Sequence, residues 1–258
     1  LVFRSRTVSR SVSQNRPQMK TSIYDRIREK DRTIARETTG REDYFLLSPT
    51  RASLMRALKP LIEKHVRGRV LDAGAGSKAY AARLSEFAAE YVSLDVTVER
   101  AMPSVVGSVL GLPFADASFD TVFCSQVLEH VPEPATAVRE IARVLVPGGT
   151  LLLTAPHLAY LHNEPHDYFR FTSHGLRHLC VSAGLEVEEI RPAGGLLSFL
   201  GHIPSVAGKA LLRPVPLVYD CFLLLNGYWS RMVAWLDERL ERRKLFALNY
   251  IVVARKSG

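Results

Sequence analysis

The amino-acid sequence predicts an α/β fold with a doubly wound, mainly parallel β-sheet. From residue 69 onward, short apolar segments typical of strands alternate with segments at helical spacing, which is the pattern of such sheets. Several strand segments, among them 149–155, are continuous apolar runs, as expected when helices cover both faces of a sheet. The chain has 258 residues, of which 47% are hydrophobic and 23% charged, so wholesale disorder is excluded.

The expected elements follow in chain order. Residues 22–37 mix charges at helical spacing with a thin apolar stripe, which predicts a marginal surface helix. Ser48 and Pro49 predict the start of a second helix, with Ser48 as its N-cap and Pro49 at its first position. The expected strands are 69–73, 91–95, 104–109, 119–124, 149–155, 185–190 and 246–254. The expected helices between them are 78–89, 134–145 and 173–183.

The net charge of +8 is concentrated near the start of the chain. Residues 1–20 hold five basic residues and no acid, and residues 43–258 hold an excess of only two basic residues. Residues 1–21 are therefore expected to be a disordered basic tail. Three interpretations stay open. The segment is an organelle transit peptide, or an arm that binds an anionic surface, or the sequence begins too early and Met19 is the true first residue. Since the body lacks a basic stripe, no nucleic-acid partner is expected.

Cysteine usage and hydropathy point to a reducing compartment and to no spanning helix. The three cysteines lie far apart without metal-ligand spacing, so neither a disulfide framework nor structural zinc is expected, and a cytoplasmic location fits. No apolar run reaches the roughly 18 residues of a membrane span. Residues 192–244 form an apolar stretch. It is expected to be a helical cap or a homodimer interface, with a segment lying on a membrane as the alternative.

Carboxylates and glycines follow the first two strands. Asp72, Gly74, Ala75 and Gly76 end the first strand, where glycines let a ligand approach the backbone. Asp72 would repel a pyrophosphate but suits an ammonium or a sulfonium. Asp95 follows Gly76 by 19 residues, where an acid can accept ribose hydroxyls. The alternatives are a tight strand-to-helix turn and a turn aspartate.

Four motifs, the first two of which contain the residues just described, form one pattern. The runs VLDAGAGS, LD, GLPFADASFDTVFCSQVLEHV and EIARVLVPGGTLLLTAP occur in this order. They resemble class I S-adenosylmethionine-dependent methyltransferases with a methyltransferase-11-type domain, over residues 45–190 and the last strand. The resemblance implies a Rossmann-like sheet with an antiparallel last strand and S-adenosylmethionine as cofactor. It divides the chain into the tail, a helical segment 22–66, a core 67–191 with 245–258, and the insertion 192–244.

The resemblance also implies roles for single residues. Asp72, Gly74 and Gly76, with Ala75 between them, would hold the methionine part of the cofactor, and Asp95 the ribose. Ser108 and Val109 would contact the adenine. Ser125 and Gln126 would line the pocket beside the sulfonium. Ser108 stands where the family often has an aspartate. Glu129 and His130 match the LEH run of the family, with fixing of the loop after the fourth strand as the alternative role.

The acceptor side is expected after the fifth strand, where histidines are frequent. Histidine suits a base for a hydroxyl acceptor, so His166 with the adjacent Asp167 is the first candidate and His157 the second. The alternative is that this segment packs over the pocket and caps the following helix. No metal is expected, because Pro165 argues against a helix that would pair His162 with His166.

The sequence therefore predicts an enzyme that methylates a small-molecule or glycan hydroxyl. The run HNEPHDYFRFT resembles a methyltransferase-11 subgroup tied to polysaccharide and glycolipid assembly. Two alternatives stay open: a lipid-like acceptor, either a quinone or a lipid-linked molecule, and a non-catalytic protein that keeps the cofactor fold. The first alternative would place a cytoplasmic protein at the membrane periphery through residues 192–244.

Overall fold

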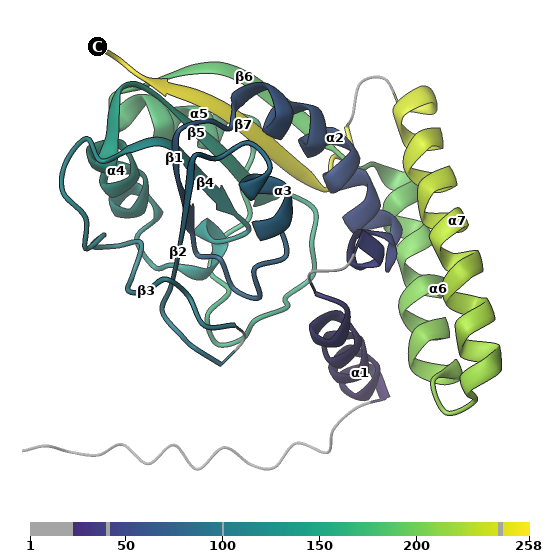
Figure 1. The fold of residues 1–258 in the computed structure, drawn as a ribbon. Coiled ribbons are helices and arrows are strands. Elements are labelled where there is room, and N and C mark those ends of the chain that lie inside the picture. Colours follow the sequence, from purple (N-terminus) through teal and green to yellow (C-terminus); the bar gives the residue numbers. More distant parts are fainter. Residues whose placement is uncertain (1–22, 40–41, 100, 242–244) are drawn as a thin grey trace, which may run out of the picture.

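A seven-stranded sheet forms the centre of the protein (Figure 1). The computed structural model describes residues 23–39, 42–99, 101–241 and 245–258, so the predicted basic tail 1–21 lies outside the described residues. The strand order is β3-β2-β1-β4-β5-β7-β6. Strands β1 to β5 are parallel, whereas β7 runs antiparallel to both β5 and β6. The predicted doubly wound sheet with an antiparallel last strand is confirmed.

The strands are β1 Arg69–Ala73, β2 Glu90–Asp95, β3 Val105–Val106, β4 Phe119–Ser125, β5 Leu145–Pro156, β6 Leu185–Ala193 and β7 Asn249–Lys256. The helices are α1 Ile23–Thr38, η1 Glu42–Leu46, α2 Pro49–His65, α3 Ala81–Ser85, η2 Leu128–His130, α4 Pro134–Val144, α5 Ser173–Ser182, α6 Leu196–Leu212 and α7 Pro216–Leu240.

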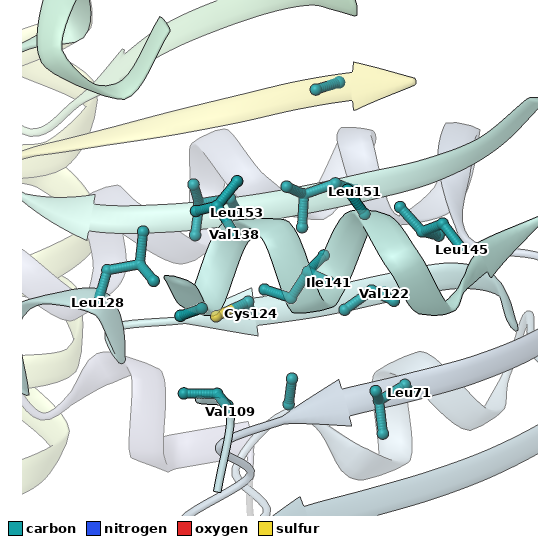
Figure 2. Close-up of a cluster of buried hydrophobic side chains, with 14 of the residues drawn as sticks. Leu71, Val109, Val122, Cys124, Leu128, Val138, Ile141, Leu145, Leu151 and Leu153 are labelled. Atoms are coloured by element: carbon teal, nitrogen blue, oxygen red, sulfur yellow. The ribbon is translucent and has the colours of Figure 1, made fainter. Parts of the chain in front are cut away.

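Helices cover both faces of the sheet, so its central strands bury side chains on two sides. On one face, Leu151 and Leu153 of β5 join Val138 and Ile141 of α4 in a buried cluster (Figure 2). On the other face, Leu152 of β5 packs in a second cluster with side chains of α2 and α3. This two-sided burial explains the continuous apolar runs of the sequence.

Two elements are shorter than the sequence predicts. Strand β3 contains only Val105–Val106 and pairs with the end of β2, because the chain then turns at an isolated bridge between Ser108 and Gly111. Helix α3 begins only at Ala81, because Lys78 takes a left-handed backbone conformation with φ +58°, which no α-helix accommodates.

Helix α2 begins where the sequence predicts, but its first turn is capped differently. Ser48 lies in the N-cap position without a side-chain bond to a backbone amide. Its Oγ lies 2.9 Å from Oγ1 of Thr50 instead.

Helices α6 and α7 form an antiparallel pair beside the sheet (Figure 1). Both pack against α2, and α6 also packs against α1. Asp31 of α1 pairs with the buried Lys209 of α6, and Glu37 of α1 pairs with Arg213 directly after α6. None of the helices within the described ranges has both the length and the apolarity that crossing a bilayer requires.

Candidate active site

Four strand ends lie in a row at one edge of the sheet. In the order β3, β2, β1, β4, these parallel strands all end at the same edge. Three spacings of ~4.8 Å between adjacent strands give the row a length of about 14 Å. The predicted cofactor residues lie at or just after these ends, so the topology brings together residues that are up to 54 positions apart between Asp72 and Gln126.

The loop after β1 approaches its neighbours so closely that it requires glycine. Gly74 has φ +82°, and a Cβ on it would lie 2.5 Å from Cγ2 of Val127. The backbone amides of Gly74 and Ala75 both donate to the carbonyl of Leu94, at 2.8 and 2.9 Å. Gly76 also has a positive φ of +52°. The loop is therefore held against the end of β2 in one conformation.

Asp95 joins this loop to the loop after β2. Its Oδ2 accepts the amide N–H of Gly76 at 2.8 Å, and its Oδ1 accepts that of Thr97 at 3.1 Å. The side chain remains partly exposed. Since each carboxylate oxygen has two lone pairs, both can still accept a hydroxyl of a ligand at this edge.

Asp72 differs from Asp95 because it is buried. The residue is 3% exposed, and its Oδ2 accepts the hydroxyl of Tyr91 at 2.7 Å. Burial raises the pKa of the Asp72 carboxyl to about 7. A cation bound above the loop would favour the ionised form.

The two ends of the row are built differently. After β3, Oγ of Ser108 accepts the amide of Leu110 at 3.1 Å, and Val109 is buried in the core. After β4, Oγ of Ser125 lies 2.8 Å from Oγ1 of Thr154, and Nε2 of Gln126 donates to that same hydroxyl at 3.1 Å. The apolar side chain at the β3 end is therefore packed into the core, whereas the β4 end carries polar groups.

A cavity of about 470 Å³ opens beside the β4 end of the row. It reaches the predicted cofactor edge through Ser77 and Gln126. Its remaining walls come mainly from α1, η1, α2, α6 and the segment after β5, with a few residues from η2 and the starts of α3 and β7. They are Asp31, Thr39, Tyr44, Phe45, Thr50, Arg51, Leu54, Tyr80, His130, Pro156, Leu158, Ala159, Tyr160, His162, Asn163, Phe199, His202, Val206, Leu248 and Asn249. Aromatic and aliphatic side chains thus form much of the lining, as is usual for small-molecule sites.

One end of the cavity is polar. Asp31, Arg51 and His202 line it, and the buried Lys209 pairs with Asp31 from behind. Nδ1 of His202 lies 3.2 Å from Oγ1 of Thr50. Burial lowers the pKa of His202 to about 4, so this imidazole is neutral at physiological pH and can exchange hydrogen bonds with a polar group of a ligand.

The three predicted catalytic residues do not line this cavity. His166 is exposed, and its Nδ1 lies 3.1 Å from the hydroxyl of Tyr168. Nδ1 of His157 lies 3.1 Å from the carbonyl oxygen of Phe171. The side chain of Asp167 is buried and accepts two bonds from Arg170, which lower the pKa of its carboxyl. Their catalytic roles remain predictions.

The structure instead brings His130 and His162 to the cavity wall, with Glu129 behind them. The ring centroids of the two histidines are 4.9 Å apart. Glu129 is fully buried, and burial raises the pKa of its carboxyl to about 8. The sequence contained a signal for two of them in the LEH run, but it did not place His162, which lies 32 residues after His130, beside that run.

Comparison with protein families decides the class of the domain. Residues 71–153 match the sequence profile of the type 11 methyltransferase domain. This chain contains a methyltransferase domain. The resemblance to class I S-adenosylmethionine-dependent methyltransferases predicted from the motifs is thereby confirmed.

Curated relatives are similar in sequence to part of this chain. The demethylmenaquinone methyltransferase of Corynebacterium kroppenstedtii is 30% identical over 151 residues, which are 56% of this chain and 62% of the relative. The chain therefore spans about three fifths of the length of the curated relatives that it matches.

Solved structures share the fold at low sequence identity. The 1,6-didemethyltoxoflavin-N1-methyltransferase of Burkholderia thailandensis, with bound 1,6-didemethyltoxoflavin and S-adenosylhomocysteine, has a TM-score of 0.52 and 17% identity, covering 95% of this chain and 93% of that one. The cyclase SpnF has a TM-score of 0.56 and 20% identity, covering 78% of this chain and 80% of that one. Because a cyclase shares the fold, activity has to be argued from the site.

The matched methyltransferase segment contains only half of the candidate site. All predicted cofactor residues from Asp72 to Gln126 lie within residues 71–153, together with Glu129 and His130. His162 and the cavity walls from α1, α2 and α6 lie outside it. Most of the cavity lining therefore comes from parts of the chain outside the matched segment.

Proposed function

We propose that this protein is an S-adenosylmethionine-dependent methyltransferase that acts on a small molecule bound in the 470 Å³ cavity. One observation carries the proposal. The row of strand ends that holds the predicted cofactor residues runs directly into this cavity at Ser77 and Gln126. A cofactor lying along the row with its adenine at β3 would present its methyl group at the β4 end.

The residues along the row fit this cofactor. The positive φ angles of Gly74 and Gly76 keep the loop backbone close to the sheet edge, where a side chain would obstruct a ligand. Asp95 has lone pairs left for two ribose hydroxyls, and Asp72 supplies a carboxyl near a bound ammonium or sulfonium. The adenine contact predicted for Ser108 and Val109 would come mainly from their backbone, because the side chain of Val109 is buried.

The reaction needs position more than covalent chemistry. When bound, the cofactor would supply a methyl group whose bond to sulfur breaks with the electron pair left on sulfur, and the acceptor atom would bond that group and release its proton to a base. Holding both reactants in line is the main contribution of a protein to such a step. Here α1 and α6 line the cavity, where they can exclude water and orient the acceptor.

We favour a lipid-like acceptor with an aromatic ring, such as a quinone. Aromatic side chains, including Tyr44, Phe45 and Phe199, line the cavity. The relative that is named a demethylmenaquinone methyltransferase acts on a quinone by its name. Helix α7 also exposes an apolar face beside the cavity-lining α6, which would let the protein rest on a membrane that dissolves such an acceptor.

A small-molecule or glycan hydroxyl is the second candidate. The polar end of the cavity, with Asp31, Arg51 and His202, favours an acceptor that carries hydrogen-bonding groups. Both candidates use the same cofactor row, so they differ only in what fills the cavity.

Isothermal titration with S-adenosylmethionine tests the cofactor site, and a radiolabelled methyl-transfer screen tests the acceptor. We expect binding, and transfer to a reduced quinone in detergent. Transfer to sugar hydroxyls in place of the quinone would select the second candidate. Cofactor binding without transfer to any acceptor would favour a non-catalytic protein, and no binding at all would refute the proposal.

A further inference from the structure

Three metal-ligating side chains meet at the cavity wall. Glu129 and His130 lie in η2 after β4, and His162 lies in the segment after β5. One ligand atom from each residue lies within 4.8 Å of the other two. The Nε2 atom of His130 is 3.7 Å from Oε1 of Glu129. A single ion of ordinary size can therefore lie between all three after small side-chain rotations, since metal–ligand bonds measure about 2.0–2.2 Å.

Glu129 is the observation that points to a ligand. Its side chain is 0% exposed, and neither carboxylate oxygen has a hydrogen-bond partner among the residues that the structure describes. A buried carboxylate without a partner is costly, and such groups in native proteins are usually paired or bound to a metal. A bound cation would remove that cost by stabilising the anion.

The two histidines are oriented as metal ligands usually are. Nδ1 of His130 lies 2.7 Å from the carbonyl oxygen of His166, so this nitrogen carries the proton and Nε2 carries the lone pair. Nδ1 of His162 lies 3.2 Å from the carbonyl of Tyr160 and 3.4 Å from Oδ2 of Asp167. A ligating histidine typically donates its other ring N–H to a carbonyl or carboxylate in this way.

Asp167 and Arg170 hold this arrangement in place. Nη2 of Arg170 lies 3.5 Å from Nδ1 of His162. This is farther from Nδ1 than the carbonyl oxygen of Tyr160 and Oδ2 of Asp167. The guanidinium is already engaged by both oxygens of Asp167 and by the carbonyls of Ala159 and Tyr160. Asp167 therefore neutralises Arg170 and also faces His162, which makes it a positioning residue for the cluster.

We propose that Glu129, His130 and His162 bind a divalent transition-metal ion such as zinc, with its open coordination position facing the cavity. Two imidazoles and one carboxylate form the ligand set of many catalytic zinc sites, which keep a fourth position for a water or a substrate. Both histidines line the cavity that borders Gln126. The ion would thus face the acceptor.

The role of the ion in turnover rests on the proposed function. A metal-bound hydroxyl is more acidic than a free one. An acceptor hydroxyl on the ion would lose its proton to solvent, and its oxygen, or a ring carbon conjugated with it, would then attack the methyl group. This assignment places an activating group in the wall of the cavity. The predicted catalytic residues His157, His166 and Asp167 do not line the cavity.

Binding of Co²⁺ to the full-length protein, purified without a histidine tag and stripped with a chelator, tests the site. We expect one equivalent of Co²⁺ to give visible absorption bands that Zn²⁺ abolishes. Glu129→Gln and His162→Asn each remove one ligand. Since loss of a hydrogen-bond partner of a ligand already costs about 10–100-fold in metal affinity, we expect each of these variants to bind Co²⁺ at least about 100-fold more weakly.

His178→Asn is the matched control, because His178 is an exposed histidine on α5 outside the cluster; its Co²⁺ affinity should equal that of the wild type. Circular dichroism and the affinity for S-adenosylmethionine report whether each variant is folded. If the wild type binds no stoichiometric Co²⁺, or folded Glu129→Gln and His162→Asn bind it as tightly as His178→Asn, the metal site is refuted. Full transfer activity in the chelator would refute the ion's role and leave the proposed function intact.

Discussion

Two carboxylates at neighbouring strand ends have opposite environments. Asp95 lies partly exposed and accepts two backbone amides, whereas Asp72 is buried against the hydroxyl of Tyr91. The amides stabilise a carboxylate, but burial disfavours it. The two amides therefore fix the orientation of the Asp95 carboxylate at the sheet edge, while the charge of Asp72 depends on pH and on what is bound above it.

Asp72→Asn should remove a pH dependence of stability. Burial raises the pKa of Asp72 to about 7, whereas an aspartate in an unfolded chain titrates near ~3.9. Between these values the folded protein keeps a proton that the unfolded chain has released, so its free energy of unfolding falls as pH rises and levels off above about 7. Urea unfolding without ligand should show that the free energy of unfolding of the wild type falls by at most about 4 kcal/mol relative to that of Asp72→Asn between about pH 4 and about pH 8. A difference that stays constant with pH would contradict this.

Asp95→Ala should weaken the binding of S-adenosylmethionine. The change removes the acceptor of two loop amides and of the ribose hydroxyls, and each hydrogen bond to a charged group contributes about 1.5–3 kcal/mol. We expect a loss of at least about tenfold in affinity by isothermal titration. Glu99→Gln, which alters an exposed carboxylate in the next turn of the chain, is the control and should bind normally. Equal affinities of both variants would show that Asp95 does not contact the cofactor.

At the scale of elements, α1 depends on α6 for its place at the cavity. Lys209 is fully buried and pairs with Asp31, whereas the pair of Arg213 with Glu37 is exposed. Removing one member of a buried pair leaves the other charge uncompensated, which is strongly destabilising. Exposed pairs contribute little. The buried pair therefore holds α1 over the cavity.

Lys209→Met should release α1 without unfolding the sheet. The expected cost is about 3–5 kcal/mol at the α1–α6 contact, seen as faster amide hydrogen exchange within residues 23–38 and reduced methyl transfer with unchanged affinity for the cofactor. Arg213→Met should change the free energy of local opening, as measured by amide exchange in the same residues, by only about 0–1 kcal/mol. Similar protection of α1 in both variants would show that the buried pair does not hold the helix.

The elements of the sheet could be predicted from the sequence, but the acceptor side could not. Apolar runs and glycines place Asp72, Gly76 and Asp95 at strand ends, because strand order is implied once the alternation of strands and helices is recognised. His162 reaches Glu129 only through the fold of a loop fixed by Arg170, and no periodicity encodes such a contact. The same limit explains why His166, chosen for its residue type, lies exposed.

At the scale of the whole molecule, a cofactor half and an acceptor half meet at β4. The cofactor half is the edge of the sheet within the matched domain. The acceptor half combines α1 and α2 with α6. Helix α7 packs on α6 and α2, and its outward face is apolar: Leu217, Val218, Leu224, Leu225, Tyr228, Trp229, Met232 and Trp235 are exposed. Such a face fits a membrane surface or a second copy of the chain.

Replacing Leu225 and Met232 by glutamate tests which surface covers this face. Burial of a large apolar side chain contributes about 1.5–3 kcal/mol, so we expect the double variant to co-sediment with anionic liposomes at least about tenfold more weakly. The experiment uses protein that lacks residues 1–18, to remove the basic segment as a cause of binding. Val181→Glu alters an exposed apolar residue of α5 and should bind as before. A parent protein that does not bind vesicles but dimerises would assign the face to self-association.

The pairing of β6 with β7 has a consequence for how this protein could diversify. Ala193 at the end of β6 is the register partner of Asn249 at the start of β7, so the whole α6–α7 excursion leaves and re-enters the sheet at two adjacent points. Exchange of that excursion for a longer, shorter or differently lined one would leave every strand pair in place. New acceptors can then be acquired by replacing a single contiguous stretch of the gene, while the cofactor edge is inherited unchanged.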